Sequence, residues 1–233
     1  MKRPSPIRDE RGTTMVEVLV SLSTGLIVLV ALTTVILVVL NGNARVSARV
    51  DATQRARITL SKIMQELHSA CVEPRVPPIL TDSTGTSLIF MHSVSAEGGE
   101  VAPKPIRSVI ELKEGTLTQT DYEATSEAQP WVFSETAMGP SEQLASNISP
   151  TPPNSWIFRY YAYGTGAISS TALKEPLDAT TAGDTILVEV AFDAAPSRAQ
   201  AGDDGATASI KESASLRLTP PSFSEEVEAL PCQ

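Results

Sequence analysis

The sequence has few of the residues that most often carry catalysis or bind metals. Among 233 residues there are only two histidines, His68 and His92, and only two cysteines. Neither histidine has companions at a metal-ligand spacing, so each is expected at the surface or at a sheet edge. Asp203-Asp204-Gly205 begins like a calcium loop, but the later ligands are missing and a turn is expected. The patterns GxSxG, HExxH and CxxC and the phosphate-binding loop are absent. The sequence therefore predicts no catalytic residues, no metal and no cofactor.

Basic and aromatic residues are also scarce. The net charge is −9 and aromatic residues make up 5% of the chain. Because the first twelve residues carry a net charge of +2, the rest of the chain carries −11. An acidic body without a basic stripe argues against a nucleic-acid partner. The 17 prolines, together with many serines and threonines, favour short strands and loops over a helix bundle.

Charged residues are missing altogether between Glu17 and Arg45. The run 18–43 has neither a charge nor a proline, and about 20 apolar residues suffice to span a bilayer core. In lipid a helix is the default, because the backbone has no other way to satisfy its polar groups. We expect a transmembrane helix over 13–43. Its orientation stays open, since four basic residues stand before the run and four shortly after it: Lys2, Arg3, Arg8 and Arg11, then Arg45, Arg49, Arg55 and Arg57.

Glu17 stands at the start of this uncharged run and allows two interpretations. It is either an interfacial carboxylate that reaches for the headgroups, or an intramembrane group with a functional partner. Cleavage after Gly12 would create such a partner, because it frees an α-amino group on Thr13. That cation would lie at the same membrane depth as the Glu17 of a neighbouring subunit.

Residues 11–17, RGTTMVE, with a short basic leader before them and an apolar helix after them, resemble the processing site of type IV pilins and type II secretion pseudopilins. The resemblance implies that a prepilin peptidase cuts between Gly12 and Thr13 and methylates the new amino terminus on Thr13. It also implies that Glu17 pairs with an amino terminus during filament assembly. The family usually has phenylalanine or methionine at the position of Thr13, a departure that concerns methylation more than cleavage.

The resemblance also implies partners, a location and a domain order. The partners are the prepilin peptidase, other major or minor pilins or pseudopilins, and an assembly platform in the membrane. The chain would cross the cytoplasmic membrane once with its carboxyl-terminal head outside, and it would enter a surface filament on assembly. The expected organisation is a leader over 1–12, a transmembrane helix over 13–43, an amphipathic helix over 44–73 and a β-rich head over 74–233.

The amphipathic segment follows from its own pattern. Residues 44–72 contain neither proline nor glycine, and Pro74 should end the helix. Apolar residues recur at helical spacing on one stripe that should face the core of the head: Leu60, Ile63, Met64, Leu67 and Cys71. The four arginines over 45–57 are expected on a solvated face, or against acidic heads of neighbouring subunits.

The remaining chain predicts short antiparallel strands, and hence an α+β fold of the pilin kind, with the long helix packed on a mainly antiparallel sheet. Strands are expected over 87–93, 108–122 (a hairpin turning at 113–115), 130–133, 155–163, 185–192 and 214–219. Turns are expected over 149–154, 180–184 and 195–206. The aromatic strand 155–163 would have a core face and an exposed face, or would form a ligand platform. The order of these pieces resembles minor pilins and pseudopilins of the W and J type.

The two cysteines, Cys71 and Cys232, gain meaning if the head is exported. An even number of cysteines outside the cytoplasm favours a bridge. The alternative is a buried free thiol at Cys71 and an incidental Cys232. For the whole chain, the leading interpretation is a minor pilin or pseudopilin, a structural subunit and not an enzyme. The other interpretation is a signal-anchored extracellular binding domain or enzyme that is unrelated to pili.

Overall fold

The structure is a computed structural model that describes residues 14–70, 77–93, 105–126, 130–164, 166–196 and 207–216. The chain divides into two compact units, Met1–Val46 and Ser47–Gln233. Each unit is taken by itself below. The second unit is called the head.

The first element is the long helix α1, Met15–His68. The expected helix over the apolar run is therefore confirmed. In the head part of α1, the predicted stripe is also confirmed: Leu60, Ile63, Met64 and Leu67 are buried, together with Ala52, Ala56 and Thr59. The fifth predicted member, Cys71, lies outside the described residues, as does Pro74. The helix ends at His68, and Ala70 then forms a bridge with His92.

One sheet of the head has four antiparallel strands in the order β1-β2-β3-β4. They are β1 Ser87–Ser93, β2 Pro105–Lys113, β3 Thr116–Glu123 and β4 Glu142–Ser146. The expected hairpin is β2 and β3, whose register pairs Lys113 with Thr116. Its two turn residues, Glu114 and Gly115, have φ values of 48° and 76°. Two successive positive φ values match the twist of a tight hairpin, which explains the glycine at this position.

The second sheet is built around β7 Thr185–Ala194, which pairs antiparallel with β5 Ile148–Ser149, β6 Phe158–Ala162 and β8 Ala208–Ser215. The strand expected over 185–192 is confirmed as β7. The aromatic strand is shorter than expected. Phe158 and Tyr160 form its core face, and Tyr163 is exposed. Ile157, which precedes the strand, is buried as well. Its N–H donates to the Gly85 carbonyl oxygen.

Three expectations for the head were wrong. The segment 130–133 is not a strand and makes only an isolated bridge from Phe133 to Ala124. The last strand begins at Ala208 and shares only residues 214 and 215 with the expected 214–219, of which 217–219 lie outside the described residues. The expected turn over 180–184 is the short helix α2 Ala179–Asp184. Asp178 caps this helix, because its carboxylate accepts hydrogen bonds from the backbone N–H groups of Thr180 and Thr181.

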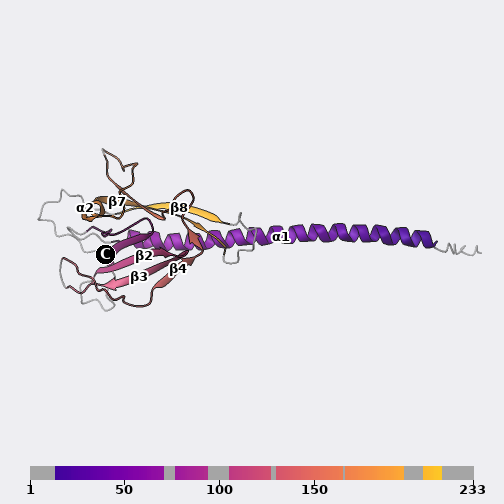
Figure 1. Cartoon of the computed structure of the whole chain (residues 1–233), viewed down its shortest axis with the longest axis horizontal. Coiled ribbons are helices and arrows are strands. Elements are labelled where there is room, and N and C mark those ends of the chain that lie inside the picture. Colours follow the sequence, from indigo (N-terminus) through magenta and orange to yellow (C-terminus); the bar gives the residue numbers. More distant parts are fainter. Residues whose placement is uncertain are drawn as a thin grey trace, which may run out of the picture. The chain divides into compact units, whose positions relative to one another are not determined.

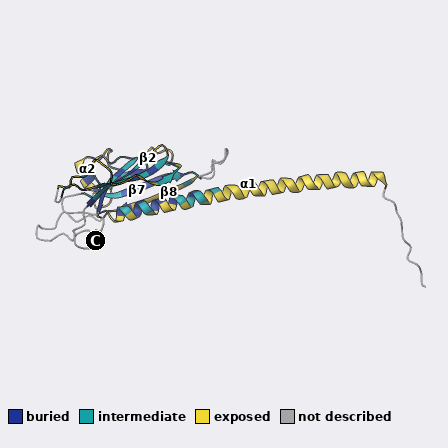
Figure 2. Cartoon of the chain, turned by 90° about the horizontal axis from the view of Figure 1, so that it is seen from below, coloured by how far each residue is buried: buried dark blue, intermediate teal, exposed yellow. Residues whose placement is uncertain are grey.

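A single hydrophobic core joins the buried stripe of α1 to the inner faces of both sheets. It includes Ile63 and Leu67 from α1, Phe90 from β1, Tyr160 from β6 and Phe192 from β7. Figure 1 shows β2, β3 and β4 grouped in one layer, and β7 and β8 in another. Figure 2 shows buried residues inside these layers and on the part of α1 that lies against them. The fold is therefore α+β, with an apolar amino-terminal helix and two antiparallel sheets.

Candidate functional site

The predicted processing site falls at the border of the described chain. Gly12 and Thr13 lie outside the described residues. Thr14 immediately precedes α1, and the N–H of Glu17 donates to the Thr14 carbonyl oxygen at 3.0 Å and to its Oγ1 at 3.4 Å. Glu17 is thus the third residue of the helix, the position of the glutamate in a capping box. Its negative charge also suits the positive end of the helix dipole.

The Thr14–Glu17 spacing is a local signal that the interpretation of Glu17 from the sequence did not include. A threonine followed three residues later by a glutamate, just ahead of an apolar run, is typical of a helix start. Glu17 is exposed in the first turn of α1. The structure therefore gives Glu17 a role in starting the helix, which is compatible with either of the two interpretations.

The apolar run after Glu17 is exposed along its length in its own unit. Its most apolar stretch has a mean hydropathy of 2.6, and none of that stretch is buried. The large side chains are exposed around the whole helix, for example Leu19 at 61%, Ile27 at 66% and Val38 at 66%. An apolar surface of this extent in a single chain points to a partner or to lipid. By its length and composition, this helix could cross a membrane.

The hydroxyl groups within the run do not interrupt its apolar surface. Thr33 Oγ1 donates to the Leu29 carbonyl oxygen at 2.8 Å, and Thr34 Oγ1 donates to that of Val30 at 2.9 Å. Ser23 and Thr24 bond in the same way to carbonyl oxygens one turn earlier. A hydroxyl group that is satisfied by its own helix has no need of water. These four polar residues are therefore compatible with a hydrocarbon environment.

The arginines after the run do not all behave as a solvated face. Arg45, Arg49 and Arg57 are exposed, as expected. Arg55 is half-buried: its Nη2 donates to the Ala195 carbonyl oxygen at 2.9 Å and lies 3.2 Å from Asp51 Oδ2. The expectation was wrong for Arg55, because the helix turns this residue toward the chain that follows β7. Arg55 joins α1 to the second sheet.

The two histidines have different surroundings. His68 is exposed. His92 lies on the edge strand β1, where a histidine was expected, but it is buried and not at the surface. Its Nε2 lies 2.8 Å from Ser108 Oγ, and its Nδ1 lies 3.9 Å from Glu66 Oε2.

Serine, histidine and carboxylate occur in this order in nucleophilic triads, but Ser108 is not an available nucleophile. Its side chain is 0% exposed and its hydroxyl donates to Asp121 Oδ1 at 2.5 Å. The cluster links α1 to three strands of the first sheet, which is a structural role. Among the described residues, no group of three or more histidine, cysteine or acidic side chains could hold a metal ion.

The cysteines of the predicted bridge, Cys71 and Cys232, both lie outside the described residues. Of the five site residues predicted from the sequence, the structure describes only Glu17. The other four lie outside the described residues: Gly12, Thr13, Cys71 and Cys232. Comparison with models of known protein families gave no match. Comparison with curated proteins gave none either.

Proposed function

We propose that this chain is a pilin-like subunit, a minor pilin or pseudopilin. A prepilin peptidase would cut it after Gly12, and it would then assemble through its amino-terminal helix into a type IV pilus or a secretion pseudopilus. One observation carries the proposal: a glycine stands five residues ahead of a glutamate in the first turn of α1, and the apolar run that follows this glutamate is exposed. The α+β head with a buried helix stripe is compatible with such a subunit.

The mechanism is one of assembly, not of catalysis. Before assembly, the apolar part of α1 holds the subunit in the bilayer with the head outside. In a filament, the helices of neighbouring subunits replace lipid around the exposed apolar side chains of 18–40. Glu17 would then lie in a low-dielectric helix bundle, where an unpaired carboxylate is costly. A neighbouring amino terminus supplies the opposite charge, so this pairing selects subunits that have been processed.

A signal-anchored extracellular domain would have the same apolar helix but would keep residues 1–12. Intact-mass analysis of the protein made in its own host distinguishes the two. The proposal expects a mature chain that begins at Thr13. Recovery of mature protein that still carries residues 1–12 would contradict it.

A matched pair of glycine variants tests the same step by substitution. Gly12→Ala should block the cut, because the peptidase must approach the backbone closely at this residue. Gly25→Ala, within the apolar part of α1, should be processed normally, since a Cβ there meets nothing within 4 Å. Equal processing of the two variants would count against a prepilin peptidase.

A further inference from the structure

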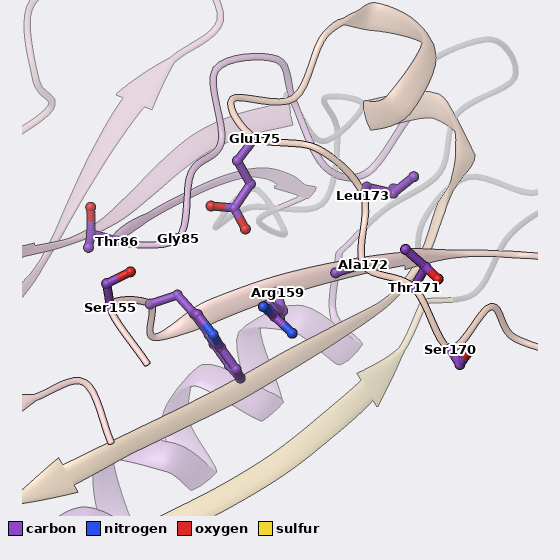
Figure 3. Close-up of a pocket in the computed structure, with 10 residues that line it drawn as sticks. Gly85, Thr86, Ser155, Arg159, Ser170, Thr171, Ala172, Leu173 and Glu175 are labelled. Atoms are coloured by element: carbon purple, nitrogen blue, oxygen red, sulfur yellow. The ribbon is translucent and has the colours of Figure 1, made fainter. Parts of the chain in front are cut away.

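The head contains a cavity of about 740 Å³. Small-molecule sites typically have volumes of about 300–1,000 Å³. Three segments line the cavity: the loop before β1, the start of β6 and the segment that precedes α2. Figure 3 shows them converging on one space, with Glu175 and Arg159 extending into it from different segments. The lining residues are Gly85, Thr86, Ser155, Trp156, Arg159, Ser170, Thr171, Ala172, Leu173 and Glu175.

Backbone hydrogen bonds fix these three segments to one another. The Gly85 carbonyl oxygen accepts from the N–H groups of Ile157 at 2.6 Å and Phe158 at 3.0 Å. The N–H of Leu173 donates to the Tyr160 carbonyl oxygen at 2.8 Å. The strand β6 is therefore held between the other two segments. The cavity is pre-formed, which lowers the entropy cost of binding.

Glu175 and Arg159 are the two charged groups of the lining. Partial burial raises the pKa of Glu175, and this outweighs the opposing effects of a hydrogen bond from the Gly85 N–H and of the Arg159 charge. The Arg159 guanidinium lies over the Trp156 ring, 4.6 Å from its centroid. A cation on an indole face is held by the ring quadrupole. Both charged groups are thus held in place at the wall of the cavity.

A close approach at Gly85 makes this arrangement possible. A Cβ on residue 85 would come within 2.8 Å of both Glu175 Oε2 and Trp156 Cβ. Real Cβ atoms do not approach other atoms so closely, so any larger residue would displace the carboxylate or the tryptophan. Gly85 therefore lets the Glu175 carboxylate and the Cβ of Trp156 pack closely against the loop before β1.

The chemistry of the lining favours a neutral ligand with many hydroxyl groups. One carboxylate and one guanidinium give the lining a net charge of zero, which favours neither a phosphate nor a metal cation. Four hydroxyl side chains surround them: Thr86, Ser155, Ser170 and Thr171. A carboxylate accepts two hydrogen bonds from neighbouring hydroxyl groups, and a guanidinium fork donates two.

Trp156 also lines the cavity. Its Nε1 is covered and has no hydrogen-bond partner among the described residues. Because this N–H is covered, the cavity does not offer it to a ligand.

We propose that this cavity binds a neutral saccharide, with Glu175 and Arg159 bonding to its hydroxyl groups and Trp156 flanking the sugar. The head would then recognise a carbohydrate surface. This role does not depend on processing or filament assembly, so the two proposals can fail separately.

The test uses the full chain in a zwitterionic detergent, because detergents with sugar headgroups would compete for the site. The chain is applied to an array of neutral, sialylated and sulfated glycans. We expect neutral glycans to bind. An array on which no neutral glycan binds, or on which only the sialylated or sulfated glycans do, would overturn the proposal.

A second readout reports on the cavity directly. The sequence has two tryptophans, so Trp131→Phe leaves Trp156 as the sole tryptophan. A bound neutral glycan should shift the fluorescence emission of this variant. The other probe is a mixture of free amino acids, which are zwitterions and also match a site of zero net charge. A shift with amino acids and none with glycans would overturn the saccharide assignment.

Pocket variants complete the test. Glu175→Gln and Arg159→Met should each weaken binding of the array-selected glycan at least about tenfold, the usual effect of losing a hydrogen bond to a charged group. Glu135→Gln, at an exposed residue outside the lining, should bind as the parent does. Undiminished binding by both pocket variants would overturn the proposal. Circular dichroism checks the fold of each variant. The fluorescence measurement is made on Trp131→Phe, which keeps Glu175 and Arg159, so it tests the proposal even if neither pocket variant folds.

Discussion

At Glu17 two physical roles meet in one side chain. It is the third residue of a helix that Thr14 caps, and it is the carboxylate at the head of an apolar run. Glu17→Val removes both roles, whereas Glu17→Gln keeps a residue type that suits the cap and removes only the charge. On the proposed function, both variants insert into the membrane and both enter filaments less than the parent does, because both lose the partner for an amino terminus.

The measurement is the share of each variant that co-purifies with the assembled filament, relative to the share in the membrane. Normal assembly of Glu17→Gln together with poor assembly of Glu17→Val would mean that the helix start matters and the charge does not. Normal assembly of both would leave Glu17 an interfacial residue.

Gly85 offers a second test at a single residue. Gly85→Ala should lower the free energy of unfolding by about 1–3 kcal/mol, because a Cβ has no room beside Trp156 and Glu175. Gly139→Ala is the matched control, since a Cβ there meets nothing within 4 Å, and it should be close to neutral. Denaturant unfolding of the full chain, followed by tryptophan fluorescence, measures both. Equal free energies of unfolding for the two variants would show that Trp156 and Glu175 can move away from a Cβ at residue 85 at little cost.

The pKa of Glu175 gives a prediction about pH. Its folded-state pKa is raised, chiefly by burial, so the folded protein holds the proton more firmly than the unfolded chain does. Ionisation of Glu175 therefore destabilises the fold as pH rises from the unfolded pKa through the folded one. Glu175→Gln removes this effect. Its melting temperature, relative to that of the parent, should rise between pH 4 and pH 8, and a difference that falls over this range would contradict the prediction.

At the scale of elements, α1 has a buried face and an exposed face within the head, and one isoleucine lies on each. Ile63 is 0% exposed and Ile58 is 70% exposed. Ile63→Ala should cost about 2–5 kcal/mol of unfolding free energy, because it leaves a cavity between the helix and both sheets. Ile58→Ala should change the stability by about 0.5 kcal/mol or less. Comparable losses in the two variants would mean that the stripe is not what holds α1 to the sheets.

The elements that could be predicted from the sequence are those with a strong local signal. The apolar run and the 3.6-residue stripe predict α1, and Glu114-Gly115 between alternating residues predicts the β2–β3 hairpin. The strands β4 and β8 have no such signal. In β8 the less exposed positions are Ala208, Ile210 and Ala214, but Glu212 interrupts this alternation, and the bounds of the strand follow from pairing with β7. Tertiary pairing, not local preference, defines these two strands.

The cavity could not be predicted for a related reason. Gly85 and Glu175 are far apart in the sequence. Their segments meet through hydrogen bonds to β6 and through direct backbone bonds of Leu177 to Asp82 and Ser83. The aromatic strand gave a partial signal, because a ligand platform there was one of the two interpretations. Trp156 and Arg159 do line the cavity, while Tyr163 on the same segment is exposed and does not.

At the scale of the whole molecule, the distribution of charge and apolar surface separates the chain into two kinds of environment. Unit 1 contains the long exposed apolar surface, and the head contains a complete core of its own. Residues 44–233 carry a net charge of −10, whereas residues 1–43 carry +1. By length and composition the apolar helix could cross a membrane, and the charge of the head is typical of a surface in contact with water.

The compartment of the head decides the state of its two cysteines, and this gives the last prediction. If the head lies outside the cytoplasm, as the proposed function requires, thiols there oxidise and bridges persist. Only one intramolecular bridge is available to the chain, Cys71–Cys232. It would close a long loop and stabilise the fold by about 5 kcal/mol in the chain-entropy view, before any strain. It would also link the tail, EEVEALPCQ, to the segment that follows α1.

Non-reducing peptide mapping of the protein isolated from its own host should recover Cys71 and Cys232 in one cross-linked pair. Cys232→Ser should melt at a lower temperature than the parent, and a reducing agent should lower the melting temperature of the parent but not of the variant. The reducing agent is the control for the serine itself, since it breaks the bridge without changing the sequence. Two free thiols in protein taken from outside the cytoplasm would contradict the bridge. The same two thiols in protein recovered from the cytoplasm would instead contradict the orientation, because a reducing compartment keeps any such pair open.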